Sequence, residues 1–137
     1  MKRLLYIVFA AAIVACVCSC RQHNVDMSAF TSDPTIRLTS SGVTQFTYDP
    51  RTCQLSFNRT RGEFAVFNDD QTDFFVVTVD AIPTQKGHEV NGSVQWTTAS
   101  NIEDHKNIAL KAVKLEGDKI WLWCSDLNLG AVVRVLE

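Results

Sequence analysis

The sequence predicts a single all-β domain, either an antiparallel β-sandwich or a small closed barrel of about eight or nine strands. Apolar and polar residues alternate with a period of two from Ile36 onward, and helical spacing is absent from this region. Turn signals rich in Gly, Asn and Asp separate the apolar runs. The length of 137 residues, 46% of them hydrophobic, fits one domain with one modest core.

The expected strands follow one another along the chain, and their alternating apolar residues mark the buried face. These residues are Ile36, Leu38, Cys53, Leu55, Phe57, Val94, Trp96, Ile108, Leu110, Ala112, Ile120, Leu122, Cys124, Val133 and Val135. Phe64–Phe67 and Phe74–Val79 are short runs of strand-forming residues, which is typical of strands buried on both faces. The only segment expected to hold a helical turn is Ala99–Asn107.

Turns are expected between these strands. Their signals are Ser41-Gly42, Asp49-Pro50, Arg61-Gly62, Asn68-Asp69-Asp70, Lys86-Gly87, Asn91-Gly92 and Gly117-Asp118. The segment Leu115–Ile120 has the pattern of a tight hairpin that joins two neighbouring antiparallel strands.

The N-terminal segment predicts a secretory signal peptide over residues 1–19. Lys2 and Arg3 form a short positive region, and the uncharged apolar run Leu4–Val17 follows. As a helix this run would be about 21 Å long, which is too short for the hydrocarbon core of a bilayer, about 30 Å thick. The polar residues Arg21, Gln22, His23 and Asn24 end the apolar stretch sharply, and we interpret the segment as a signal peptide and not as a spanning helix.

Residues 17–20, with the sequence VCSC, resemble the lipobox of bacterial lipoproteins. The resemblance implies cleavage before Cys20 by signal peptidase II and acylation of that cysteine. A second match, IVAC, ends at Cys16 and is the alternative. We favour Cys20, because cleavage there leaves a longer apolar run and removes Cys16 and Cys18. Ordinary secretion, with cleavage by the general signal peptidase, is the other alternative.

This resemblance implies a protein held on a membrane outside the cytoplasm, in the bacterial cell envelope, on the outer membrane or the periplasmic face. Acyl chains contribute about 0.8 kcal/mol per buried methylene, and two or more of them anchor a protein stably. We expect the lipidated cysteine and a flexible tether over residues 20–35, because this segment has little periodicity. The all-β domain is then expected over residues 36–137.

Two cysteines lie within the predicted domain, Cys53 and Cys124, both on the apolar side of a strand. Outside the cytoplasm they can form a disulfide. Such a bridge, closing a loop of about 70 residues, would add about 4 kcal/mol of stability. The alternative is two separate buried thiols, and the sequence favours neither. The chain has no Cys-x-x-Cys and no clustered His, so we expect no metal and no cofactor.

The three tryptophans form the candidate aromatic binding surface. Trp121 and Trp123 are two residues apart in one expected strand, so they point to the same face, opposite Ile120 and Leu122. If that face is exposed, the pair, with Trp96 as a neighbour, is a platform for a sugar ring, a peptide or a lipid. We favour the alternative, in which the strand is central and buried on both faces.

Other polar clusters have ordinary structural explanations. His88 and His105 are expected in exposed polar loops beside acidic residues, but no Gly-x-Ser-x-Gly motif accompanies them, and we assign no catalytic residue. Asn68–Asp73 is rich in oxygen ligands, yet it lacks the EF-hand glycine and is expected to be a turn. A basic cluster comprises Arg51, Arg59 and Arg61. A solvated, partly paired surface is its expected role.

The charge and the motifs together favour a non-enzymatic binding or accessory module anchored by lipid in the cell envelope. A net charge of −2 and a pI near 5.9 exclude a polybasic nucleic-acid binder. The partner is then an envelope protein, a glycan or a small apolar ligand. The alternatives are a lipocalin-like barrel that carries a small apolar ligand and an enzyme with an unrecognised site at His88 or His105.

Overall fold

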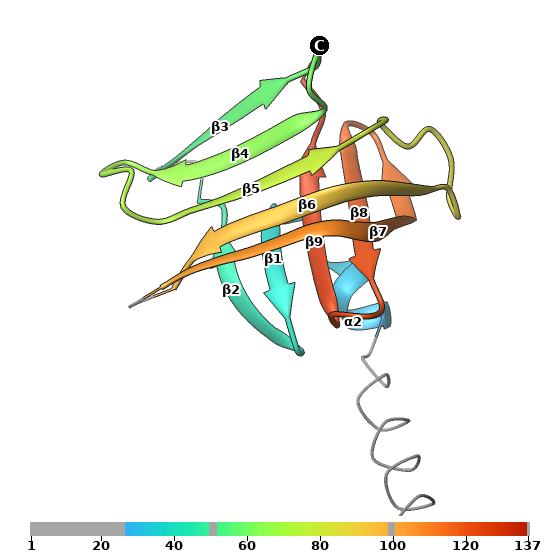
Figure 1. Cartoon of the computed structure of the whole chain (residues 1–137), viewed down its shortest axis with the longest axis horizontal. Helices are drawn as coiled ribbons and strands as arrows, with labels where there is room; N and C mark the ends of the chain where they lie inside the picture. Colours follow the sequence, from blue (N-terminus) through green and yellow to red (C-terminus); the bar gives the residue numbers. More distant parts are fainter. Residues whose placement is uncertain (1–26, 50–51, 99–100, 137) are drawn as a thin grey trace, which may run out of the picture.

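One antiparallel sheet makes up most of the structure, a computed structural model that describes residues 27–49, 52–98 and 101–136 (Figure 1). Its strands are β1 (Arg37–Ser40), β2 (Val43–Thr47), β3 (Cys53–Asn58), β4 (Glu63–Asn68), β5 (Phe74–Val79), β6 (Glu89–Thr97), β7 (Ile102–Glu116), β8 (Lys119–Cys124) and β9 (Leu129–Arg134). The short helix α2 (Met27–Ser32) precedes them. The predicted all-β class is confirmed.

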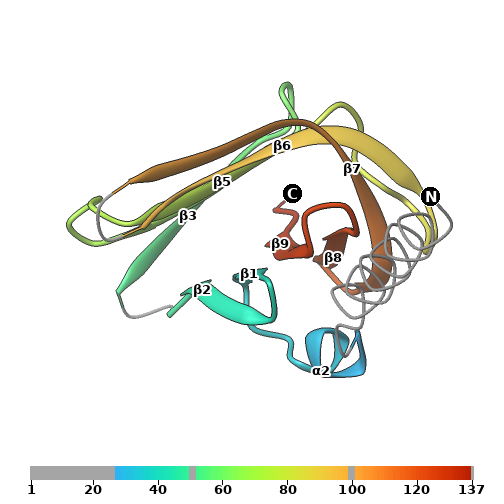
Figure 2. The same cartoon turned by 60° about the horizontal axis from the view of Figure 1, so that its bottom comes forward.

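The strand order is β2-β1-β9-β8-β7-β6-β5-β4-β3, and every neighbouring pair is antiparallel. The sheet curls into a half-barrel, which Figure 2 shows with β3 to β7 arching over β1, β2, β8 and β9. Within the described residues, the edge strands β2 and β3 each pair with one neighbour only. The described strands therefore form one curled sheet with two edges.

The hydrophobic core fills the concave face of this curled sheet. On β5 the side chains of Phe75, Val77 and Val79 are at most 1% exposed. Phe74 and Val76 alternate with them and are half-buried on the convex face. The expectation that β5 is buried on both faces is therefore wrong, because the convex side of this strand keeps contact with solvent.

The hairpin predicted at Leu115–Ile120 is confirmed, with these two residues paired at the ends of β7 and β8. Its turn uses Gly117 at a φ of 61°, a left-handed conformation that glycine adopts without steric cost. The helical turn considered for Ala99–Asn107 is wrong from residue 102 onward, where the long strand β7 begins.

The turn predicted at Asn91-Gly92 is wrong, because both residues lie inside β6. Gly92 instead marks a close approach of two strands. A Cβ atom at this position would lie 2.2 Å from the carbonyl oxygen of Thr78 in β5. The β6–β7 register also shifts between Gly92 and Val94, so the glycine lies beside an irregularity in the ladder.

The helix α2 lies in the segment expected to be a flexible tether, so that expectation is wrong for residues 27–35. Phe30 is 4% exposed, and its ring centroid lies 5.5 Å from that of Trp123 in β8. Gly130 of β9 leaves room for this ring, because a Cβ there would lie 2.6 Å from Phe30. An isolated helix of this length is unstable, so contacts with the outer face of the sheet hold it in place.

The turn between α2 and β1 is fixed by hydrogen bonds and an ion pair. The amide of Thr35 donates to Asp33 Oδ1 at 2.9 Å. Arg37 Nη1 pairs with the same carboxylate, and Arg37 Nη2 donates to the carbonyl oxygen of Phe30 at 2.7 Å. Asp33 therefore orients the arginine that closes the C-terminal end of α2.

This arrangement predicts a pH-dependent contribution to stability from Asp33. Hydrogen bonds from Thr35, together with the charge of Arg37, hold the pKa of Asp33 below its ordinary value of 3.8. Because its pKa is lower in the folded state, the ionised Asp33 carboxylate stabilises the fold in full above pH 3.8. This stabilisation is lost as the pH falls through the lowered pKa. In urea unfolding, Asp33→Asn is expected to be less stable than the wild type at pH 7 and equally stable at low pH.

The exposed carboxylate variant Asp126→Asn is the control and should show no such pH-dependent difference from the wild type. A constant difference between Asp33→Asn and the wild type across the acid range would contradict the role assigned to Asp33.

Candidate functional site

A cavity of about 280 Å³ opens at the end of the curled sheet where β6 leads into β7. Strands from opposite sides of the half-barrel meet there: β6 and β7 on one side, and β1, β2 and β9 on the other. The lining residues are Ser40, Gln45, Trp96, Thr98, Glu103, His105, Leu127 and Leu129. They come from both halves of the chain, so the curl of the sheet creates this site.

The wall on β6 and β7 consists of three side chains on the concave face. Trp96 pairs directly with Glu103, and His105 lies two residues further along β7 on the same face. The exposed loop expected for His105 is therefore wrong, because the residue lies inside a strand and is half-buried. The rings of Trp96 and His105 stack with a centroid distance of 5.2 Å and an interplanar angle of 28°. The stacked indole and imidazole therefore line the same wall of the cavity.

Trp96 carries a buried hydrogen-bond donor without a partner in the described part of the chain. The residue is 5% exposed, and its Nε1 has no hydrogen-bond partner among the described residues. Buried polar groups in proteins almost always have a partner, and an unmet donor costs about 1–3 kcal/mol. The nitrogen itself has almost no exposed surface, so this donor is not open to the cavity.

The charge of the cavity wall is carried by Glu103, whose side chain is 44% exposed. Its Oε2 lies 3.7 Å from His105 Nε2, so a protonated imidazole would form an ion pair with it. No lysine or arginine is among the residues that line the cavity. With neutral histidine the wall is anionic, which disfavours negatively charged ligands.

A second cavity, of about 510 Å³, lies at the other end of the strands. Its lining includes Ile82, Leu115 and Val135, and the β7–β8 turn forms its rim. Asp118 in this turn pairs with Arg134, and the hydrogen bond from Arg134 holds the pKa of Asp118 below its ordinary value. The Asp118 carboxylate on this rim is thus already paired within the protein.

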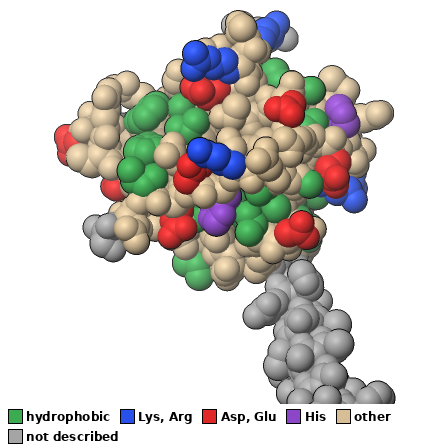
Figure 3. Space-filling view, viewed as in Figure 1, with side chains coloured by type: hydrophobic (Ala, Val, Ile, Leu, Met, Phe, Trp, Pro, Cys, Tyr) green, Lys and Arg blue, Asp and Glu red, His purple; other side chains and the backbone are tan. Residues whose placement is uncertain are grey.

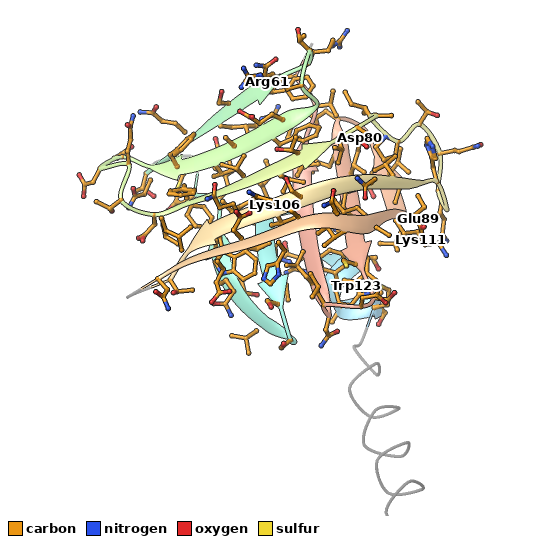
Figure 4. The ribbon with its side chains drawn as sticks, in the orientation of Figure 1. Arg61, Asp80, Glu89, Lys106, Lys111 and Trp123 are labelled. Carbon is orange, nitrogen blue, oxygen red and sulfur yellow. The ribbon has the colours of Figure 1, made fainter. Side chains whose placement is uncertain are left out.

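The tryptophans do not form one surface. Trp121 and Trp123 are 1% and 8% exposed, as expected for a central strand buried on both faces, and they lie on the outer face under α2. Figure 4 shows Trp123 beside this helix. The indole of Trp121 donates to the carbonyl oxygen of Asp33 at 3.2 Å. Trp96 lies on the concave face at the cavity, so the candidate surface of three tryptophans is not assembled.

Cys53 and Cys124 are both free thiols in the structure. Cys124 is 1% exposed and packs in the main core as a small apolar residue, and Cys53 is half-buried at the start of β3. Of the two alternatives left open by the sequence, the structure therefore has the separate thiols. Cys16 and Cys20, the candidate lipidation sites, lie outside the described residues.

The Asn68–Asp73 segment is the turn that was expected. The side-chain oxygen of Asn68 accepts hydrogen bonds from the amides of Thr72 at 2.9 Å and Asp73 at 3.2 Å. Among the residues that the structure describes, no group of His, Cys, Asp and Glu has the arrangement of a metal site. The side-chain oxygen of Asn68 is thus occupied by hydrogen bonds within the turn.

The remaining sequence candidates within the described residues lie apart from the cavity. Arg59 and Arg61 are exposed in the β3–β4 turn, and Arg51 lies outside the described residues. His88 precedes β6, and its Nδ1 is buried without a partner in the described part of the chain. Figure 3 shows acidic and basic side chains interspersed over the viewed face, with hydrophobic side chains gathered at its left. That face therefore has no large patch of a single charge.

No family model matches the chain, and the comparisons with curated proteins and with solved structures find no significant match. Within the described ranges, no helix has the length and apolar character needed to cross a bilayer. The function is therefore argued from the chain's own residues.

Sequence reasoning missed most of the cavity. Ser40, Gln45, Leu127 and Leu129 carry no motif, and they lie far from residues 96–105 in the sequence. Only the strand order brings them to the same end of the sheet. The available signal was the alternation that places Trp96 on the core face, with acidic and histidine side chains following in the next strand.

Proposed function

We propose that the chain is a lipid-anchored, non-enzymatic binding or accessory module of the bacterial cell envelope. The lipobox-like sequence ending at Cys20, after a charged start and an apolar run, supports the location. The observation that carries the binding role is the cavity at Trp96, where the Trp96 indole, the His105 imidazole and the Glu103 carboxylate line one wall.

The proposed anchor would keep the domain close to the membrane. Residues 21–26 separate Cys20 from Met27, where α2 begins. A chain extends by at most about 3.6 Å per residue, so this spacer can span no more than about 25 Å. A module held in this way acts on partners or ligands near the membrane surface.

We propose further that the curled sheet functions as a small barrel and not as a two-layer sandwich. Phe46 on the edge strand β2 contacts Phe75 on β5, with ring centroids 5.2 Å apart, so side chains connect opposite walls of the curl. Large side chains such as Phe64 and Leu110 fill its centre. This filling favours a small ligand at the end of the barrel over a deep lipocalin-like ligand chamber.

A second candidate function, an enzyme with His105 as general base, is favoured by one observation. Glu103 lies beside His105 at the cavity, the arrangement in which a carboxylate orients an imidazole. The separation of 3.7 Å exceeds the hydrogen-bond distance of such pairs, and no described residue beside them forms a nucleophile elbow. The non-enzymatic role is therefore preferred.

The anchor is tested by the intact mass of the mature protein purified from bacterial membranes. We expect a chain that begins at Cys20 and carries covalent acyl chains. Cys20→Ala should abolish the acylated species, whereas Cys18→Ala, two residues away, should leave it unchanged. A soluble product that begins after residue 20, or an uncleaved chain in the wild type, would contradict the proposal, and an acylated chain starting at Cys16 would move the anchor to that residue.

A further inference from the structure

We infer that the free edge of β2 takes up an extended segment of a partner protein, and that one lysine or arginine side chain of this segment enters the cavity at Trp96. This inference rests on the proposed function, because it names the kind of partner that the same binding site recognises. Three features carry it: a strand edge without a neighbour, a cavity beside that edge and the charge of the cavity wall.

The outer edge of β2 has no strand beside it among the described residues. The amide of Tyr48 donates to the carbonyl oxygen of Ile36, just before β1, at 2.6 Å. Thr47 precedes Tyr48 and lies opposite Arg37. Because hydrogen-bonded and non-hydrogen-bonded pairs alternate in an antiparallel ladder, the backbone N–H and C=O of Thr47 point away from β1. β2 therefore offers main-chain hydrogen-bonding groups to an added strand.

The sequence of β2 does little to keep another strand away. Soluble proteins commonly protect such edges with charged residues or proline, and Val43–Thr47 contains neither. Four of its five residues are exposed, and Val43 is 60% exposed. The ladder with β1 has a bulge at Gln45. A bulge can redirect a side chain, and Gln45 is the β2 residue that lines the cavity.

The cavity lies beside this edge. Gln45 of β2 and Ser40, which pairs with Val43 at the β1–β2 hairpin, line one side, and Trp96 and Glu103 line the other. In Figure 2, β2 is the outermost of the strands that lie under the arch. The side chains of an added strand alternate between its two faces. A side chain on the concave face of that strand can therefore enter the cavity.

The size of the cavity suits one side chain. Its volume of about 280 Å³ is slightly below the range of typical ligand pockets, which begins at about 300 Å³. Phe64 and Leu110 fill the centre of the curl, so the bound segment stays at the edge. Trp96 and Leu127 supply apolar lining. The methylene chain of lysine or arginine can pack against such a surface.

Charge selects a basic side chain. Glu103 carries a carboxylate at this wall, and no lysine or arginine is among the lining residues. Lys106, the next cation along β7, lies on the opposite face of the strand and pairs with Asp104 at 3.5 Å. With neutral His105, Glu103 therefore has no cationic partner in the lining. A lysine or arginine supplies one, whereas an aspartate or glutamate would be repelled.

The test is a peptide titration of the mature chain in a neutral detergent, in mildly alkaline buffer, followed by NMR of the backbone amides. The probe is a capped peptide of sequence Thr-Val-Thr-Lys-Thr-Val-Thr, in which the lysine shares a strand face with the valines. Two comparison peptides carry glutamate or norleucine in place of lysine. We expect the lysine peptide to bind most tightly and to slow hydrogen exchange at the Thr47 amide. Binding of the glutamate or norleucine peptide as tightly as the lysine peptide would overturn the inference.

Two further peptides test whether binding occurs by strand addition. One is N-methylated at its odd-numbered residues and the other at its even-numbered residues. Alternate amides of a strand point to opposite edges, so only one set faces β2 in a given orientation. We expect one methylated peptide to bind much more weakly than the other. Equal effects of the two methylations would contradict pairing with β2.

Variants of the protein locate the binding. Thr47→Pro removes the outward N–H while the bonds to β1 remain, and it should weaken binding of the lysine peptide about tenfold. Thr47→Val keeps the N–H and should bind as the wild type does. Glu103→Gln should weaken binding about fivefold, as expected for a partly exposed ion pair. Its matched control is Glu89→Gln, an exposed glutamate at the other end of β6 that is labelled in Figure 4.

Equal binding by Thr47→Pro and the wild type, both with unchanged circular dichroism, would rule out β2 as the docking edge. If Thr47→Pro does not fold, the methylated peptides decide the question with the wild type. A wild-type dimer that Thr47→Pro dissociates would assign the edge to a second copy of the chain and overturn the inference.

These results are independent of the test of the anchor. An acylated chain that binds no lysine peptide would retain the envelope location and reject the partner segment. A chain without acylation that binds the peptide through β2 and Glu103 would do the reverse.

Discussion

Replacing Trp121 with alanine is expected to destabilise the protein by about 3–5 kcal/mol, the range for deleting a large buried aromatic side chain. Trp121 is 1% exposed between the sheet and the segment after α2. Its loss would also leave the carbonyl oxygen of Asp33 without the indole donor, and Lys114 Nζ without the ring that lies 4.6 Å away. Domains are stable by about 5–15 kcal/mol, so much of the stability would disappear. Urea unfolding followed by circular dichroism measures the effect.

Ile102→Ala is the control for this experiment, because Ile102 is a large apolar residue that is 61% exposed. Its stability should remain close to that of the wild type. A small effect of Trp121→Ala, together with strong acrylamide quenching of tryptophan fluorescence in the native wild type, would contradict the burial of Trp121. It would also restore the exposed aromatic platform as an explanation of the Trp121 and Trp123 spacing.

The second large effect is expected from Gly92→Ala, which adds a single methyl group. The new Cβ would lie 2.2 Å from the carbonyl oxygen of Thr78 and 3.1 Å from Leu110 Cδ1. The first of these atoms belongs to the backbone of β5, so it cannot rotate away as a side chain does. Overpacking alone costs about 1–3 kcal/mol, and separation of β5 from β6 would add the loss of ladder hydrogen bonds. Thermal unfolding should therefore show a clearly lowered midpoint.

The neighbouring variant Ser93→Ala tests the same strand without the steric conflict, because Ser93 points to the opposite face from Gly92. It is expected to unfold close to the wild-type temperature. If Gly92→Ala matched Ser93→Ala, the close approach of β5 and β6 would not be as tight as the structure has it.

The strands could be predicted from the sequence because burial on one face leaves a period-two pattern. Leu55 and Phe57 on β3, or Leu110 and Ala112 on β7, alternate with polar residues for this reason. The turn at Gly117 was also predictable, because its left-handed φ of 61° favours glycine.

The features that the sequence did not reveal depend on contacts between distant segments. Gly92 has the same local signature as a turn glycine, and only the proximity of Thr78 explains its presence in a strand. Phe30 lies in a polar segment without periodicity, and it is buried because Gly130, a hundred residues later, leaves room for its ring. The cavity is similarly non-local, since residues near positions 40, 100 and 128 meet there.

The position of α2 determines how the fold responds to tension on its N-terminal end. A pulling force on this end enters the described structure at Met27 and acts on α2 before it reaches the sheet. The helix is held by side-chain contacts such as that of Phe30 with Trp123, and by the hydrogen bond of 2.7 Å from Lys114 Nζ to the carbonyl oxygen of Thr31. β1 follows, and it is hydrogen-bonded to both β2 and β9. Under load α2 is therefore expected to detach from the sheet first. This detachment lengthens the chain between the pulled end and β1, while the paired strands stay together.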